Sequence, residues 1–144
     1  MIAMSYGYVY VAQVALGANY LQVIKAFREA EAYDGPSIII AYSHCINHGI
    51  DMQKGLSQQK TMVESGTWPL FRYDPRLVAE GKNPFQLDSK EPQSEKIPEY
   101  MYNEVSFKSL RDSNPERAAM LIEKQKTMVA RRWREYKYLA DRTF

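Results

Sequence analysis

The chain has 144 residues, of which 45% are hydrophobic and 25% charged, and these fractions exclude a disordered or collagen-like polypeptide. Nineteen Lys and Arg residues against seventeen Asp and Glu leave a net charge of +2, which is too small to make nucleic acid or an anionic membrane the expected partner. The single cysteine, Cys45, excludes an internal disulfide and any all-cysteine metal site built from this chain alone. We therefore expect a cytoplasmic protein without a signal peptide or a membrane span.

The first forty residues predict one βαβ unit. Residues 8–14 are rich in β-branched and aromatic side chains and predict a strand. Asn19 is a candidate N-cap for an amphipathic helix over residues 20–32, which Asp-Gly-Pro at 34–36 ends. Residues 37–42 form a nearly continuous apolar run, which is typical of a strand buried on both faces of a parallel sheet.

The best functional candidates follow this second strand, because ligands of open α/β sheets bind beyond the carboxyl ends of the strands. Cys45 lies there between His44 and His48. The residues leave four interpretations open. Cys45 is a buried small hydrophobe, a nucleophile activated by His44 or His48, part of a zinc site with both histidines and Asp51 as a weak fourth ligand, or one ligand of an iron–sulfur cluster whose other ligands lie outside this chain.

The middle of the chain predicts a helix and then a long arm. Residues 51–65 can form a helix that begins at Asp51 and stops before Gly66. Residues 68–75 alternate and end in Asp-Pro, which indicates an edge strand or an extended arm. Residues 76–100 are rich in proline and charge, and we expect an irregular connection around a short strand at 84–87.

The last segment predicts a long helix from Pro115 to about Asp141, because Asn114-Pro115-Glu116 is a strong helix start. One stripe at 3–4 spacing, apolar except for Gln125, consists of Ala118, Ile122, Gln125, Val129, Trp133, Tyr136 and Ala140. Residues 108–144 hold ten Lys and Arg against five Asp and Glu. This excess predicts a basic face on the helix, which is either solvated or docked against an acidic protein partner. The face includes Lys124, Arg131, Arg132 and Arg134.

No sequence motif assigns a catalytic residue or a phosphate-binding residue. The chain has no Gly-rich phosphate loop, no H-E-x-x-H, no G-x-S-x-G and no C-x-x-C. Cys45, with His44 and His48 beside it, therefore remains the candidate site, with its four interpretations still open.

Six strings of the sequence resemble the pyruvate:ferredoxin (flavodoxin) oxidoreductase family, in the same order and over essentially the whole chain. The most specific is His44-Cys45-Ile46-Asn47-His48-Gly49-Ile50 after an apolar strand. The supporting strings are residues 3–12, 35–42 and 68–75, Asn83-Pro84-Phe85, and Asn114-Pro115-Glu116-Arg117-Ala118.

The resemblance implies the C-terminal end of a much longer enzyme, including the last part of its thiamine-diphosphate-binding domain. It implies that Cys45 is the fourth ligand of the [4Fe–4S] cluster nearest thiamine diphosphate. In the family, pyruvate is decarboxylated on thiamine diphosphate, the acetyl group passes to coenzyme A, and electrons pass through clusters to ferredoxin or flavodoxin. The full enzyme is expected to be a homodimer.

The sequence departs from the family by omission. It lacks the G-D-G motif for magnesium and diphosphate, the segment that lines the thiamine and pyruvate site, and every other cluster cysteine. By itself the chain is therefore expected to be inactive, with the remainder of the oxidoreductase as its partner.

The expected fold is α/β: an incomplete thiamine-diphosphate-binding-type fold with a βαβ unit, an irregular arm and a long C-terminal helix. The expected divisions are 1–66 for the α/β part with the cluster-ligand loop, 67–113 for the arm and 114–144 for the helix. Two alternatives stay open: a free-standing α/β protein-interaction domain with a buried thiol, and a small zinc or thiol protein that uses His44, Cys45 and His48.

Overall fold

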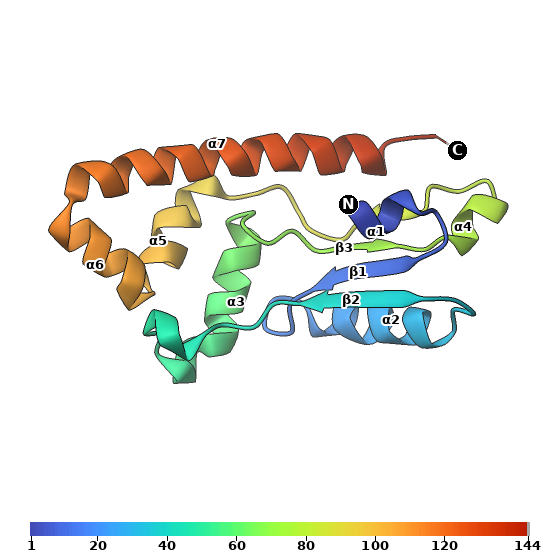
Figure 1. Cartoon of the computed structure of the whole chain (residues 1–144), viewed down its shortest axis with the longest axis horizontal. Coiled ribbons are helices and arrows are strands. Elements are labelled where there is room, and N and C mark those ends of the chain that lie inside the picture. The colour runs from blue at the N-terminus through green and yellow to red at the C-terminus, as the bar shows by residue number, and fades with distance from the viewer. Residues whose placement is uncertain (144) are drawn as a thin grey trace.

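A computed structural model describes residues 1–143. They form a four-stranded sheet at one end and a group of shorter helices at the other, with one long helix running along both (Figure 1). The strands are β1 (Tyr10–Val14), β2 (Ser37–Ala41), β3 (Phe71–Tyr73) and β4 (Phe85–Leu87). The α-helices are α1 (Ile2–Ser5), α2 (Tyr20–Glu31), α3 (Gly55–Glu64), α4 (Arg76–Ala79), α5 (Ile97–Tyr102), α6 (Val105–Ser113) and α7 (Pro115–Ala140). The 3-10 turns are η1 (Ile46–His48), η2 (Met52–Lys54) and η3 (Ser94–Lys96).

The sheet has the order β2-β1-β3-β4 and is mixed. β1 and β2 are parallel and are joined by α2, which confirms the predicted βαβ unit. β3 pairs antiparallel with both β1 and β4. The chain is therefore α/β, with a parallel pair on one side of the sheet and antiparallel strands on the other.

β1 separates two apolar layers, since alternate side chains of a strand point to opposite faces. On one face the residues that pack with Ala26 of α2 are Tyr10, Ala12 and Val14. On the other face the residues that pack under the C-terminal end of α7 are Val9, Val11, Phe71 and Phe85. β1 thus has a helix over each face.

Two helix starts lie where their capping residues predict them. The Asn19 side chain accepts a hydrogen bond from the Gln22 backbone N–H at 3.0 Å, and α2 begins at Tyr20. Asn114 accepts in the same way from Arg117 at 3.1 Å, and α7 begins at Pro115. Each cap satisfies a backbone donor that the first turn of a helix leaves free.

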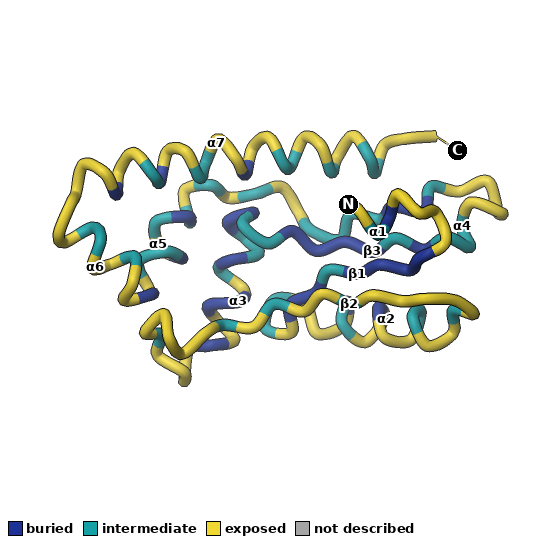
Figure 2. Tube along the Cα trace, viewed as in Figure 1, coloured by how far each residue is buried: buried dark blue, intermediate teal, exposed yellow. Residues whose placement is uncertain are grey.

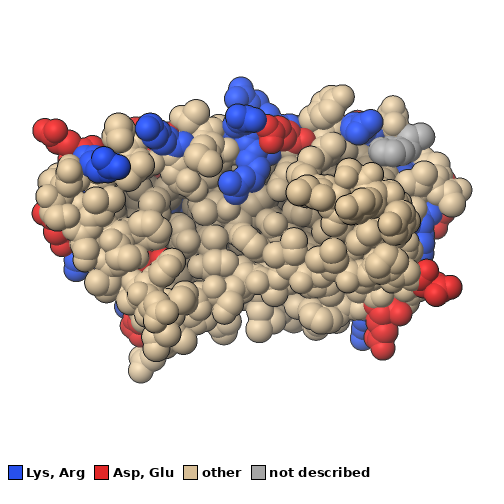
Figure 3. Space-filling view, viewed as in Figure 1, with Lys and Arg blue, Asp and Glu red and all other residues tan. Residues whose placement is uncertain are grey.

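The other end of the molecule is helical, and α7 reaches it as well. Ile97 of α5 packs with Ile122 and Val129 of α7, as the predicted stripe of α7 requires. Basic side chains gather along α7 in the space-filling view (Figure 3). Of these, Arg132 donates to the backbone oxygen of Thr67 at 2.8 Å, so part of the basic face fixes the helix to the segment before β3.

Two predictions about strands are wrong. β2 was expected to be buried on both faces, but Ile39 alone of its five residues is half-buried and the other four are exposed (Figure 2). The cause is its place at the end of the sheet, where β1 is its one neighbour. β3 was expected at an edge or in an arm, yet it lies between β1 and β4 with Phe71 buried. The predicted short strand at 84–87 is confirmed as β4.

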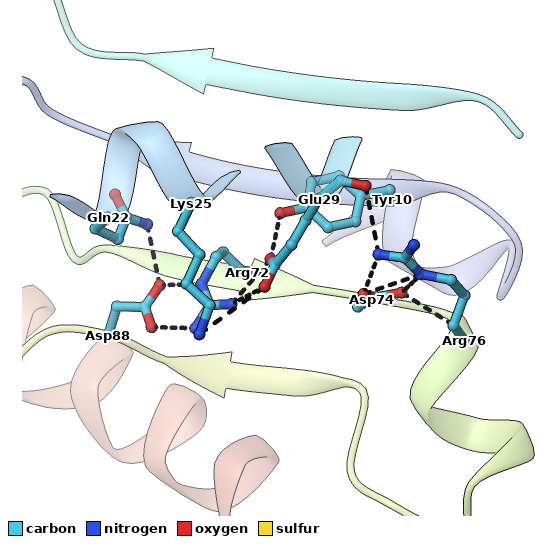
Figure 4. A network of polar contacts seen from close by, with 8 residues as sticks. All are labelled: Tyr10, Gln22, Lys25, Glu29, Arg72, Asp74, Arg76 and Asp88. Atoms are coloured by element: carbon cyan, nitrogen blue, oxygen red, sulfur yellow. Dashed lines mark hydrogen bonds and ion pairs between the residues drawn. The ribbon is translucent and has the colours of Figure 1, made fainter. Parts of the chain in front are cut away.

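A polar network fixes α2 to the β3 and β4 side of the sheet (Figure 4). Arg72 of β3 donates two hydrogen bonds to Asp88, both at 2.8 Å, and two to Glu29 of α2, at 2.7 and 2.9 Å. Burial opposes the charge of Arg72, but the bonds to Asp88 and Glu29 outweigh it and raise the pKa of the guanidinium. The Tyr10 hydroxyl donates to Glu29 at 2.9 Å. The buried charge of Arg72 is therefore matched by two carboxylates.

None of the helices within residues 1–143 is both long enough and apolar enough to cross a bilayer.

Candidate functional site

The loop after β2 carries the predicted site and is held at both ends. At its start, the Tyr42 backbone N–H donates to the Val14 oxygen at 3.0 Å, which continues the parallel pairing beyond β2. The Trp68 indole donates to the same oxygen at 3.1 Å, and its ring lies 5.6 Å from that of Tyr42. The loop therefore leaves the sheet beside the carboxyl ends of β1 and β2, as the βαβ unit predicts.

Glycine is required where the loop turns back. Gly49 follows η1 with a φ of +71°, a conformation that residues with a Cβ rarely adopt. A Cβ at this position would also lie 2.7 Å from the Cβ of Val105. The Val105 backbone N–H donates to the Gly49 oxygen at 3.3 Å, so the turn is fixed directly to the start of α6.

Cys45 is a free, exposed thiol at the start of η1. The interpretation of Cys45 as a buried small hydrophobe is wrong, and the alternative of an interaction domain with a buried thiol loses its premise. Within residues 1–143, no three His, Cys, Asp or Glu side chains form a group that could hold a metal ion. His44, Cys45 and His48 are thus not brought together as a zinc site.

His48 is held by a buried carboxylate that sequence reasoning missed. Its Nδ1 lies 2.8 Å from Oε2 of Glu104, whose side chain is only 4% exposed. Gln58 of α3 donates to the other Glu104 oxygen at 3.4 Å and to the Tyr100 backbone oxygen at 2.8 Å. Because Nδ1 faces the carboxylate, the Nε2 of His48 is the ring nitrogen left for any other partner.

His44 turns inward, against the start of α3. Its ring contacts Gly55 so closely that a Cβ there would collide with it. Its Nδ1 lies 3.5 Å from the Gln59 amide nitrogen, and the amide oxygen of Gln59 accepts from the Gly17 N–H at 2.8 Å. His44 therefore packs against α3 and anchors the loop there.

Tyr42, at the start of the loop, forms a side-chain hydrogen bond with the buried Tyr100 of α5. Burial raises the pKa of Tyr42, and a hydrogen bond from Tyr100 only partly offsets that effect. Burial also raises the pKa of Tyr100. Both hydroxyls therefore stay protonated at neutral pH and add no charge beside the thiol.

The sequence located this loop but not its support. The apolar strand and the predicted βαβ unit led to Cys45, His44 and His48. Gln58 lies 13 positions after Cys45, whereas Tyr100 and Glu104 lie 55 and 59 positions after it, and none of these spacings is typical of a site. Only their burial identifies them, since a buried charged or amide side chain normally has a specific partner.

Comparison with known proteins agrees with the family resemblance. No family model matches the chain. The chain is 56% identical over 142 residues to the pyruvate-flavodoxin oxidoreductase of Nostoc sp. and 50% identical over 141 residues to the pyruvate:ferredoxin oxidoreductase of Moorella thermoacetica. It is homologous to a segment of these oxidoreductases. The matches cover 99% and 98% of this chain but 12% of each relative.

A more distant relative extends the set of named enzymes. The pyruvate dehydrogenase [NADP(+)] of Euglena gracilis mitochondria is 42% identical over 142 residues, which is 97% of this chain and 8% of that protein. Each of these three relatives is therefore at least about eight times as long as this chain.

Proposed function

We propose that this chain is the C-terminal segment of an oxidoreductase that oxidatively decarboxylates pyruvate to acetyl-CoA and CO2. Electrons would leave through [4Fe–4S] clusters to ferredoxin or flavodoxin. The remaining polypeptide would supply the sites for thiamine diphosphate, Mg²⁺, pyruvate and coenzyme A. Identity of 50–56% over nearly the whole chain to enzymes named for this chemistry supports the assignment.

Within that enzyme, Cys45 would be the chain's single ligand to a [4Fe–4S] cluster. The observation that carries this role is an exposed, unbridged thiol on a loop anchored beside the carboxyl ends of two parallel strands. Clusters of this type commonly take four thiolates, so the donor set here fits one quarter of a site and three cysteines must come from elsewhere. A bound cluster would supply one-electron transfer, and it needs no acid or base from this loop.

The chain's own contribution is to hold that thiol in place. Glu104 fixes His48, Val105 fixes Gly49, and Tyr42 continues the pairing with β1. These contacts restrain the loop at its start and at its turn. Restraint of the ligand matters because displacement of a cluster changes the distance over which an electron must travel.

Cys45→Ala in the full-length protein tests the ligand role. We expect the variant to lose one cluster per chain, measured as iron content and as the electron paramagnetic resonance signal of the reduced protein. Met52→Ala, which removes an exposed side chain from η2, is the matched control and should keep both. Iron content and spectrum unchanged in Cys45→Ala would overturn the assignment.

A further inference from the structure

The outer edge of β2 has no partner strand among residues 1–143. The strand also lacks the charged residues and prolines that usually keep an edge strand from pairing with other strands. β2 is the last strand of the sheet, and its sequence Ser-Ile-Ile-Ile-Ala contains no charge and no proline. Natural edge strands are usually blunted by such residues or covered by another element. An unprotected apolar edge therefore indicates a strand that is covered in the working protein.

The pairing with β1 identifies the amides that face outward. The Tyr10 N–H donates to the Pro36 oxygen and the Tyr42 N–H donates to the Val14 oxygen, both at 3.0 Å. In a parallel pair, the N–H and C=O of one residue point the same way and successive residues alternate. Ile38 and Ile40 therefore face β1 with their backbone groups, whereas Ser37, Ile39 and Ala41 face the open edge.

The sheet face opposite α2 is also apolar and uncovered at this edge. Ile38 and Ile40 are 43% and 42% exposed. They share this face with the cluster under α7, because Ile39 points to the α2 side and packs there. Few charged side chains lie over this part of the molecule in the space-filling view (Figure 3). α7 thus covers the rest of this face but leaves β2 exposed.

α2 carries a second apolar strip that extends beyond the same edge. Its polar flank, with Gln22 and Glu29, reaches Asp88 and Arg72 on the β3 and β4 side. At about 100° per residue, the opposite flank is formed by Tyr20, Ile24 and Phe27, which are 60%, 47% and 55% exposed, with the exposed Glu31 as its one charge at the last residue of the helix. That flank must lie on the β2 side, so apolar side chains border the open edge on both faces of the sheet.

We propose that this edge binds a further β-strand from the polypeptide that the relatives have and this chain lacks. The proposal rests on the proposed function, and the length of the relatives supports it, because the chain covers only 12% of them. The incoming strand should be apolar on both faces, since Ile38 and Ile40 border one face and Tyr20, Ile24 and Phe27 the other. Hydrogen bonds to Ser37, Ile39 and Ala41 would set its register, as in other cases of strand addition.

Hydrogen exchange in the full-length protein tests this pairing with an internal control. The Ile38 and Ile40 amides face β1 and should be protected in any case. We expect the Ile39 and Ala41 amides to be protected as well, about a hundredfold or more relative to an exposed loop. Fast exchange at Ile39 and Ala41 beside slow exchange at Ile38 and Ile40 would overturn the proposal. Protection that disappears on dilution would assign the edge to a second copy and would overturn it too.

Substitutions at the edge give a second measurement. Ala41→Pro removes an outward N–H, and Ile40→Lys places a charge where the added strand would lie. Both should speed the exchange of the Ile39 amide in the full-length protein. Val78→Lys, at an equally exposed apolar position on α4, is the matched control and should not. Unchanged exchange at Ile39 in both edge variants would contradict the proposal.

The two proposals fail separately. If the Cys45→Ala protein keeps its full iron content, the ligand role of Cys45 is contradicted. The added strand is then still tested by hydrogen exchange at the Ile39 amide. A fast Ile39 amide in a protein of normal iron content contradicts the added strand only.

Discussion

The two sides of α2 meet the sheet in opposite ways. On the β3 and β4 side, Arg72 joins Glu29 and Asp88 through four hydrogen bonds of 2.7 to 2.9 Å. On the β2 side, Tyr20, Ile24 and Phe27 face no element among residues 1–143 and stay exposed. The charges of Arg72, Glu29 and Asp88 are paired within residues 1–143, whereas the apolar side chains on the other side stay uncovered. Side chains that satisfy one another mark a finished interface, whereas exposed apolar side chains beside an open strand mark one that needs more protein.

The largest expected effect comes from breaking the charged side. Arg72→Met leaves Glu29 and Asp88 without their cation, and we expect a loss of about 3 kcal/mol in the free energy of unfolding. Urea denaturation of the chain measures it. Arg131→Met removes an exposed ion pair with Glu135 and should cost about 0.5 kcal/mol or less. Equal losses in the two variants would mean that the network does not hold α2 to the sheet.

The loop that follows β2 is held by Glu104, which lies between α5 and α6. Glu104→Ala removes the acceptor for His48 and Gln58, and we expect a loss of about 2 kcal/mol. The loop should also become open to cleavage, so limited proteolysis within residues 44–50 should be faster than in the parent chain. Glu80→Ala, at an exposed pair with Lys82, is the control. A loop that resists the protease as before would contradict the anchoring role of Glu104.

Acid should weaken the charged side first. Burial acts to raise the pKa of Asp74, but hydrogen bonds from Arg76 outweigh it and hold the pKa below its ordinary value. The stability from this pair is therefore complete above about pH 4, the usual pKa of the unfolded side chain, and is lost as the pH falls further. The difference in urea midpoint between the parent chain and Asp74→Asn should shrink from pH 7 to pH 2. A constant difference would show that the charge of Asp74 contributes nothing.

The smallest effect is expected at the open edge. Ile38→Thr should change the free energy of unfolding of this chain by less than about 0.5 kcal/mol, because the side chain is already exposed. Ile39→Thr, one residue along the same strand, should cost about 1 kcal/mol because Ile39 packs beside Ala26 and Val14. The same urea titration compares them. A larger loss of stability for Ile38→Thr than for Ile39→Thr would show that the Ile38 side chain is buried in the folded chain.

The sequence predicted the elements that depend on local signals. Asn19 and Asn114 located two helix starts, and Gly66, with a φ of +78°, ended α3 as expected. It did not predict the place of β3 inside the sheet, because strand order depends on contacts far apart in the sequence. It also predicted β2 as a buried strand from its isoleucines. Those isoleucines are exposed here because burial requires a neighbour, and strand composition cannot say whether the neighbour belongs to the same stretch of chain.

For the site, the sequence predicted the loop and the cysteine but not the support. Cys45 follows from its place after an apolar strand and from the family string around it. The contact between Glu104 and His48 spans 56 positions and has no local signature. The exclusion of a three-donor zinc group likewise required coordinates, since the spacing of His44, Cys45 and His48 made such a site unfavourable without excluding it.

α7 has a mechanical consequence. Its first half carries Ile122 and its middle Val129 into the helical cluster, and its last turns carry Tyr136, Leu139 and Ala140 onto the sheet. One uninterrupted helix of 26 residues is therefore a structural part of both ends of the molecule. If either end unfolds, α7 loses packing contacts there, and the same helix then supports the other end less well. The sheet and the helical end should accordingly melt in a single transition, although few other elements connect them.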